Sequence, residues 1–389
     1  MYEFIVVGSG AGGATIAKEL ATKGRKLLLI EGGKSVPTER ASETYRIIPS
    51  GVEVWQTVCL GGTTLVSMGN AVRGSDAALI DYYLETEREL GVSLVPESHM
   101  GRGTKLLLSV SNNWRVMPKA IDFSICRSCG KCAYGCPYGA RWDANVYLQK
   151  AKVSGAHVLT ETQVKRVLIK GERAVGVETF DGKVFKAHNV VLSAGAIETP
   201  RILKRSGIEG AGSGLYVDTF ITLGGIKENV GLNCELNMGL FIKREGYLLS
   251  PHYSSFLLPY LSSKGWKAGP KDVLGIMVKI ADEPTGIVED TRIIKGLSNR
   301  DVDLLYRGKE EAEEILLRAG VDSKSIVSTY PRGAHPGGTC ISLIKGFEPV
   351  IDSLYISDAS VIPGPLGIPP MLTIIAMSKK LAAILTGVA

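Results

Sequence analysis

The chain opens with two apolar runs that flank a helical repeat. Residues 4–7 and 27–30 are continuous enough in Phe, Ile, Val and Leu to predict buried strands, and residues 11–22 have the 3.6-residue repeat of a helix. We expect a β-α-β unit with a right-handed crossover, because parallel strands joined by a helix adopt that hand.

Strand-like patterning returns in the middle of the chain. Residues 165–192 have the pattern of strands, with Asp181-Gly182 as the tight turn of a hairpin. From residue 215 to residue 280 the apolar residues come in short runs that are split by Gly, Pro and Ser. This punctuation favours an antiparallel sheet.

Two further helices are predicted at residues 300–319 and 371–385. Ser298, followed three residues later by Asp301, is a start signal for the first of them, and Gly320 is its stop signal. Its expected buried face consists of Val302, Leu305, Ala312 and Leu316.

Composition narrows the class of protein. With 389 residues, of which 45% are hydrophobic and 22% charged, the chain is typical of a globular enzyme. The formal net charge of +6 is not gathered into a basic block, so nucleic-acid binding has little support. No signal-peptide pattern and no membrane-spanning window are visible, so we expect a cytoplasmic protein without a membrane span.

A glycine-rich motif follows the first predicted strand. Gly8, Gly10 and Gly13 satisfy the pattern G-x-G-x-x-G, and Glu31 ends the next predicted strand. The glycines allow a pyrophosphate to approach backbone amides at the start of a helix, and the acid accepts hydrogen bonds from the ribose. FAD-binding and NAD-binding proteins share this fingerprint, and the two glycines after Glu31 favour FAD weakly.

Four segments resemble the glucose-methanol-choline (GMC) oxidoreductases and follow one another in the order of that family. The most specific match is the run SAGAIETPRIL, which resembles the second signature of the family. The matching segments are residues 6–13 with 30–33, 60–64 and on to Arg73, 193–203, and 335–340 with 358–360, Pro363 and 370–374.

The resemblance implies an α/β protein, α+β overall, with a Rossmann-like FAD-binding domain and a discontinuous, mostly antiparallel-sheet substrate domain. The implied boundaries are 1–75, 138–210 and 335–389 for the FAD-binding domain, 76–137 for an inserted segment with the cysteine motif, and 211–334 for the substrate or cap domain. The implied FAD contacts are Gly8, Gly10, Gly13, Glu31, Gly61, Gly62, Thr63, Val164, Ala194, Gly195, Asp358 and Ala359.

His335 matches the catalytic base of the family. Members of the family oxidise alcohols with a His that is paired with a second His or an Asn, and Pro369 occupies the second position in this chain. Proline has no side-chain donor or acceptor, so one imidazole would hold the substrate hydroxyl unless Tyr330, Asn70 or another side chain fills the gap. An imidazole suits proton removal as hydride leaves for the flavin.

Four of the seven cysteines lie close together. Cys126, Cys129, Cys132 and Cys136, the last followed by a proline, have the spacing of bacterial iron-sulfur proteins. A structural zinc site more often has two cysteine pairs separated by a long loop, so zinc, free thiols and disulfides rank below an iron-sulfur cluster. We expect a 4Fe-4S cluster ahead of a 3Fe-4S cluster.

The fourth ligand of this cluster is open. In two-cluster ferredoxins the Cys before Pro ligates the other cluster, and this chain has no second run of cysteines. Cys59 and Cys234 are therefore alternatives to Cys136. The run also resembles the cysteine-containing branch of the GMC family, which includes iron-sulfur sugar dehydrogenases, and this resemblance implies a redox role.

These features predict a dehydrogenase for an alcohol or sugar-like substrate. The substrate gives a proton to His335 and a hydride to FAD, and electrons leave through the cluster to an external one-electron acceptor, such as a ferredoxin-like protein or a partner subunit. The competing hypothesis, prompted by Pro369, is an electron-relay subunit or a flavin-dependent reductase of a larger complex without alcohol oxidation.

Overall fold

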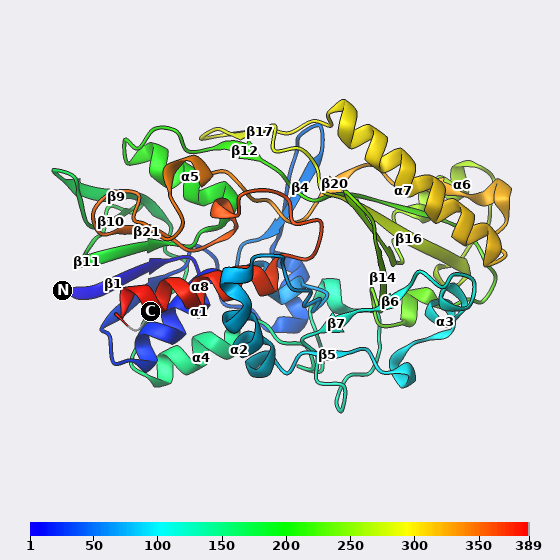
Figure 1. Ribbon diagram of the computed structural model, residues 1–389, viewed down its shortest axis with the longest axis horizontal. Coiled ribbons are helices and arrows are strands. Elements are labelled where there is room, and N and C mark those ends of the chain that lie inside the picture. Colours follow the sequence, from blue (N-terminus) through cyan, green and yellow to red (C-terminus); the bar gives the residue numbers. More distant parts are fainter. Residues whose placement is uncertain (388–389) are drawn as a thin grey trace.

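The apolar runs near the N-terminus form the centre of a seven-stranded sheet in the computed structural model, which describes residues 1–387 (Figure 1). The expected β-α-β unit is confirmed: β1 (Tyr2–Val7) and β2 (Leu27–Ile30) pair in parallel and are joined by α1 (Ala11–Thr22). The spatial order of the sheet is β8 (His157–Leu159), β2, β1, β11 (Val184–Leu192), β10 (Arg173–Thr179) and β9 (Val164–Lys170), with β21 (Leu354–Ile356) beside β11.

Alternate residues of β1 face two different helical layers. Phe4 and Val6 belong to the core formed with α1, α4 (Asn145–Val153) and α8 (Met371–Leu385). Ile5 and Val7 belong to the core on the other face, formed with α5 (Gly195–Arg205). A strand that is buried on both faces is continuously apolar, which explains the run at residues 4–7. Figure 1 shows α5 on one side of this sheet and α1, α4 and α8 on the other.

The antiparallel sheet expected within residues 215–280 is also confirmed. Its centre is formed by β13 (Thr219–Ile226), which pairs with β16 (Val273–Ile280), which in turn pairs with β15 (Tyr247–Pro251). The full spatial order is β3 (Tyr45–Ile48), β4 (Glu53–Thr57), β20 (Arg332–Gly333), β13, β16, β15, β14 (Leu240–Lys243) and β6 (Arg115–Val116), with β19 (Val327–Ser328) beside β13. The N-terminal hairpin β3–β4 thus extends this second sheet.

Helix α7 (Asn299–Arg318) covers one face of the second sheet and begins at the expected signal (Figure 1). The Ser298 hydroxyl accepts a hydrogen bond from the Asp301 amide at 3.1 Å. The expected buried face is wrong at Val302, whose side chain is 53% exposed. The buried face is centred near Gly308, and Val302 lies about 120° around the helix from Gly308 because each residue turns the helix by about 100°.

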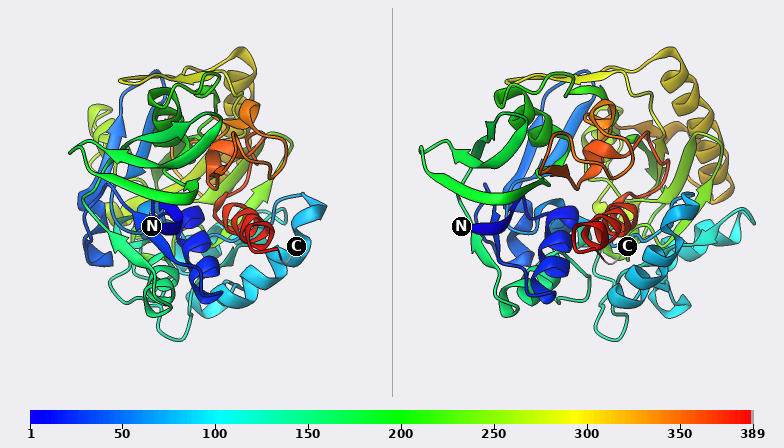
Figure 2. Two further views of the ribbon diagram at one scale, coloured as in Figure 1. Left: turned by 90° about the vertical axis from the view of Figure 1, so that its left-hand side faces the viewer. Right: turned by 60° about the vertical axis from the view of Figure 1, so that its left-hand side comes forward.

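The remaining elements are short. Helix α2 (Ile80–Leu90) packs beside α8, and Figure 2 shows the two helices next to each other. The other helices and strands are α3 (Arg102–Ser109), α6 (Leu257–Ser263), β5 (Ser93–Leu94), β7 (Pro118–Lys119), β12 (Ser213–Leu215), β17 (Gly286–Val288) and β18 (Ile293–Ile294). Within residues 1–387, none of the helices has the length and apolar character needed to cross a bilayer.

Candidate active site

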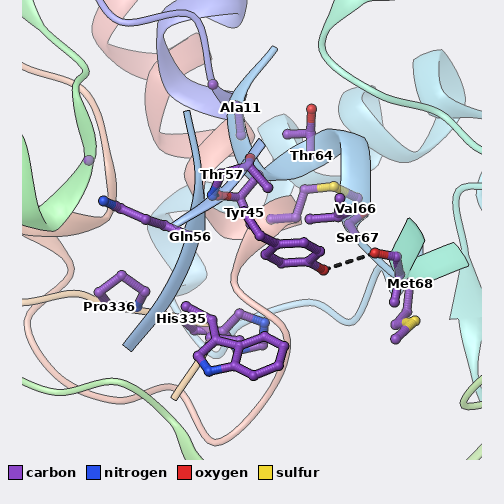
Figure 3. Close-up of a pocket in the computed structure, with 18 of the residues that line it drawn as sticks. Ala11, Tyr45, Gln56, Thr57, Thr64, Val66, Ser67, Met68, His335 and Pro336 are labelled. Atoms are coloured by element: carbon purple, nitrogen blue, oxygen red, sulfur yellow. Dashed lines mark hydrogen bonds between the residues drawn. The ribbon is translucent and has the colours of Figure 1, made fainter. Parts of the chain in front are cut away.

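A cavity of about 1290 Å³ is lined by residues of both sheets. At one end lies the glycine turn between β1 and α1, and at the other end lie His335 and Pro336; Figure 3 shows these two residues together with Ala11 and Tyr45. Pockets for small ligands are usually about 300–1,000 Å³, so this volume has room for a dinucleotide and a substrate.

The cavity collects the residues that the sequence resemblance marks as FAD contacts. All of them line it except Gly13 and Gly61. A Cβ at Gly13 would lie 2.0 Å from the Gly8 carbonyl oxygen, so this glycine permits α1 to pack against β1. The Gly61 amide donates to the Ser9 hydroxyl at 2.9 Å, so Gly61 stabilises the glycine turn between β1 and α1 through this hydrogen bond.

Two glycine turns meet at the edge of the cavity. Gly10 is the N-cap of α1, and a Cβ added there would have no protein atom within 4 Å. A Cβ at Gly62 would lie 3.1 Å from the Gly10 Cα, so the two turns touch each other. The start of α1 is therefore open toward the cavity, as a pyrophosphate site requires.

Glu31 lies at the end of β2 with its carboxylate against the first glycine turn. It accepts hydrogen bonds from the Ser9 amide at 3.0 Å, the Ser9 hydroxyl at 2.5 Å and the Gly33 amide at 2.8 Å. Burial raises the pKa of Glu31, and these hydrogen bonds oppose that change. The carboxylate is thereby held where the ribose of a dinucleotide lies in folds of this type.

Asp358 ties the start of α5 to the loop after β21. Its carboxylate accepts hydrogen bonds from the Gly195 amide at 2.9 Å, the Thr199 hydroxyl at 2.6 Å and the Ser360 amide at 2.8 Å. Burial raises the pKa of Asp358, against the effect of these donors. Ala194 and Gly195 are held by this contact at the wall of the cavity.

Several buried polar atoms at the cavity wall have no partner in the protein. They are the Ser193 hydroxyl, the Thr57 hydroxyl and the Gln56 amide nitrogen. Buried polar atoms are normally hydrogen-bonded, so a polar ligand accounts for them. The wall as a whole fits FAD, since it combines an open helix start, an acid at the end of β2 and these three polar groups.

His335 lies at the wall of the cavity and is held by a buried ion pair. Its Nδ1 is 3.1 Å from Asp218 Oδ2, and the same oxygen accepts from Lys279 Nζ at 2.7 Å. Burial acts to raise the pKa of Asp218, but Lys279 and His335 outweigh it and hold the pKa below its usual value. Sequence reasoning missed Asp218 and Lys279, although a lysine within the apolar run of β16 was a usable signal.

Pro369, which the resemblance places opposite His335, lines the same cavity. Tyr330 does not fill the gap at this position: its side chain is 70% exposed and lies outside the cavity. Asn70 does line the cavity. So does His252, which the sequence did not single out; its Nδ1 is 2.9 Å from the Thr222 hydroxyl, and burial lowers its pKa to about 4.

The cysteine run borders the same cavity. Cys129 and Ala133 line it, and the Ala133 carbonyl accepts a hydrogen bond from the Tyr45 hydroxyl at 2.9 Å. Burial raises the pKa of the Cys126 and Cys132 thiols, and the thiol of Cys136 raises both further, which indicates that these sulfurs are neighbours. Every cysteine within residues 1–387 is a free thiol.

The alternative fourth ligands lie in different places. Cys59 is buried with Leu65 and Val66 near the second glycine turn, in a cluster separate from the cysteine run. Cys234 lines the cavity in a segment that touches the run, since a Cβ at Gly130 would lie 2.3 Å from the Asn233 carbonyl oxygen. Cys340 is buried, and burial raises its pKa to about 12.

A fully buried lysine lies behind the cysteine run. Lys119 Nζ donates to the Met68 carbonyl at 2.8 Å and to Asn70 Oδ1 at 2.5 Å. Burial lowers the pKa of Lys119 to about 8, and the thiols of Cys132 and Cys126 oppose this change.

Lys119 differs from the other fully buried lysines in having no carboxylate partner within residues 1–387. Lys279 pairs with Asp218 at 2.7 Å, and Lys295 pairs with Asp282 at 2.9 Å. An unpaired buried charge is costly, so a negative group beside Lys119 is expected when the protein is complete.

A sheet of parallel central strands with a glycine turn, a cavity of dinucleotide size and an imidazole at its far end define a dinucleotide-dependent oxidoreductase. The family model of the GMC oxidoreductases matches residues 75–238. The chain is 26% identical to an uncharacterized GMC-type oxidoreductase of Mycobacterium tuberculosis, over 97% of this chain and 75% of that protein. The protein belongs to the GMC oxidoreductase family and is an FAD-dependent oxidoreductase.

Three further proteins are similar to most of this chain. The uncharacterized protein MJ1450 of Methanocaldococcus jannaschii is 36% identical over 98% of each chain. A long-chain-alcohol oxidase of Arabidopsis thaliana is 22% identical, over 95% of this chain and 64% of that protein. The crystal structure of pyridoxine 4-oxidase from Mesorbium loti has a TM-score of 0.75 at 14% identity, covering 100% of this chain and 99% of the other.

Proposed function

We propose that the protein oxidises a hydroxyl group of an alcohol or sugar-like substrate, with His335 as the base. The observation that carries this proposal is the position of His335, which lines the cavity while its Nδ1 contacts the carboxylate of Asp218. The relative from Arabidopsis thaliana, whose name identifies an alcohol as its substrate, supports the same class of substrate.

The tautomer of His335 follows from its partner. A carboxylate accepts hydrogen bonds, so Asp218 holds the proton of the imidazole on Nδ1 and leaves Nε2 free to act as a base. FAD, when bound, accepts the hydride that leaves the carbinol carbon. Gly8, Gly10 and Glu31 would hold the pyrophosphate and the ribose of the cofactor.

We further propose that Cys126, Cys129, Cys132 and Cys136 hold a 4Fe-4S cluster. The spacing of these cysteines along the chain, with a proline after the last of them, supports an iron-sulfur cluster ahead of zinc. The effect of the Cys136 thiol on the pKa of both Cys126 and Cys132 supports a shared site for these sulfurs.

The cluster would connect the cavity with the outside. Bound there, it would take electrons one at a time and pass them to an external acceptor, such as a ferredoxin-like protein or a partner subunit. Support for this role comes from Cys129, which lines the cavity directly, and from the unpaired buried charge of Lys119, which suits an anionic cluster. Oxygen should then be a poor acceptor compared with a one-electron dye.

The test is anaerobic reduction of the bound flavin by a panel of alcohols and sugars. The unmodified protein should lose its flavin absorbance, and His335→Ala should slow this reduction by about 10²–10⁴-fold, the usual contribution of a positioned base. His188→Ala, which changes an exposed histidine on β11, is the matched control and should react at the normal rate.

The outcome decides between the two functions. If no hydroxyl compound reduces the flavin of the unmodified protein while dithionite or a partner protein does, the electron-relay or reductase function replaces this one. If the flavin is reduced equally fast in His335→Ala, His335 is structural and the reaction has a different base.

A further inference from the structure

The reaction needs a second polar group at the substrate oxygen, and Pro369 does not supply it. The polar residues that line the cavity near the second sheet include Asn70, His252 and Lys279. Both ends of the Asn70 amide have partners in the protein, since Oδ1 accepts from Lys119 and Nδ2 lies 3.4 Å from Met238 Sδ.

Lys279 is linked to His335 through one atom. Its Nζ is 2.7 Å from Asp218 Oδ2, and the imidazole Nδ1 of His335 is 3.1 Å from the same oxygen. The two nitrogens are therefore separated by no more than about 6 Å, the sum of these hydrogen-bond distances. Both side chains also line the same cavity, so a ligand bound there can face both of them.

Asp218 does not use all the N–H donors of the Lys279 ammonium group. An ammonium group offers three N–H donors, and within residues 1–387 Asp218 is the acceptor that Lys279 contacts. The lysine side chain is 2% exposed, yet it lines the cavity. The small exposed part of this side chain therefore lies at the wall of the cavity.

Asp218 adopts an unfavourable backbone conformation to make this arrangement. Its φ is 51°, in the left-handed region that residues other than glycine rarely adopt. Such residues persist where the surrounding structure requires them, and they are frequent at functional sites. Here the conformation presents one carboxylate oxygen to both Lys279 and His335.

We propose that Lys279 is the second catalytic group and that Asp218 is a positioning residue for both partners. This inference rests on the proposed oxidation of a hydroxyl group. The ammonium donates a hydrogen bond to the substrate oxygen, whose proton passes to His335 Nε2. The carbon–hydrogen bond then breaks, its hydrogen leaves with the electron pair to the flavin, and the carbon–oxygen double bond forms. A fixed positive charge at the oxygen stabilises the negative charge that develops there.

The experiment compares Lys279→Met with Lys295→Met, each loaded with FAD. Lys295 is also fully buried and paired with an aspartate, Asp282 at 2.9 Å, but it does not line the cavity. The limiting rate of anaerobic flavin reduction should fall about 10²–10³-fold in Lys279→Met, the usual loss for one such donor, and should stay normal in Lys295→Met. Lys279→Arg, which keeps the charge, should recover part of the rate.

The pH profile separates a catalytic role from a structural one. In Lys279→Met, Asp218 is no longer neutralised, so it should stabilise the protonated imidazole, and the midpoint of flavin reduction should move to higher pH. A variant that is only loosened structurally keeps the original midpoint. If Lys279→Met does not fold, Lys279→Gln, which keeps a donor without the charge, replaces it with the same expected shift.

Two results overturn the inference in different ways. If alcohols reduce the flavin of the unmodified protein and Lys279→Met matches its rate and pH midpoint, Lys279 is not catalytic, while the proposed function survives. If no hydroxyl compound reduces the flavin of the unmodified protein, the proposed function and this inference fall together.

Discussion

Replacing Gly10 with valine tests the flavin site without disturbing the fold. Gly10 has φ −66° and ψ −164°, at the edge of the extended region and outside the left-handed region that favours glycine, and an added Cβ has no protein atom within 4 Å. The new side chain would stand over the start of α1, where the pyrophosphate is expected. By contrast, a Cβ at Gly12 would lie 1.8 Å from the Ser357 carbonyl oxygen.

The expected effect on cofactor binding is large. A hydrogen bond to a charged group contributes about 1.5–3 kcal/mol, so displacing the pyrophosphate from two amides would cost about 3–6 kcal/mol. This corresponds to a rise of about 10²–10⁴-fold in the Kd for FAD. Gly12→Ala should lose FAD as well, but through unfolding, because the Ser357 backbone has to move.

The assay measures FAD per chain after purification, the Kd by quenching of flavin fluorescence during reconstitution, and the Tm of each flavin-free variant. Gly296→Val is the matched control, since Gly296 is exposed and an added Cβ there is also free of contacts within 4 Å. Gly10→Val should keep the Tm of the flavin-free parent. The reasoning is refuted if Gly10→Val binds FAD with unchanged affinity, because the pyrophosphate would then lie elsewhere.

Three further predictions concern other parts of the molecule. Cys129→Ser should remove most iron and labile sulfide while FAD stays bound, whereas Cys59→Ser should retain both; stoichiometric zinc without sulfide would contradict the cluster. Lys119→Gln, which keeps a donor but not the charge, should lower the midpoint potential of the cluster by about 60 mV, which is a tenfold change in the equilibrium constant for one electron. An unchanged potential in a redox titration would show that the charge of Lys119 does not act on the cluster. Burial acts to raise the pKa of Glu89, but hydrogen bonds from Lys18, Lys379 and Tyr147 lower it to about 2. A carboxyl whose pKa is lowered in the folded state stabilises the fold at pH values above its ordinary pKa, and this stabilisation is lost as the pH falls through the lowered pKa. Glu89→Gln should therefore lower the free energy of unfolding in urea by roughly 2 kcal/mol at pH 7 and by almost nothing near pH 2. An equal loss at both pH values would contradict this role of Glu89.

Local patterns predicted much of this fold. The runs at residues 4–7 and 27–30, the helix between them and the last helix, Met371–Leu385, lie where the periodicity placed them. Each of these segments owes its pattern to burial on a defined face, which nearby residues express in order along the chain. The buried face of α7 was harder to predict from the sequence, and Val302 was wrongly assigned to it. More than one face of this helix carries apolar residues, so periodicity alone does not identify the buried face.

The position of His335 at a cavity was likewise predictable, since its motif has a recognisable order of residues. Its partners were not. Asp218, Lys279 and His335 come from three distant parts of the chain, and the pairing of β13 with β16 brings the first two together. Lys119 reaches both Asn70 and the cysteine run only after folding. Periodicity records which side of an element is buried, whereas the identity of the group on the other side of a contact depends on strand register and packing, which are properties of the tertiary structure alone.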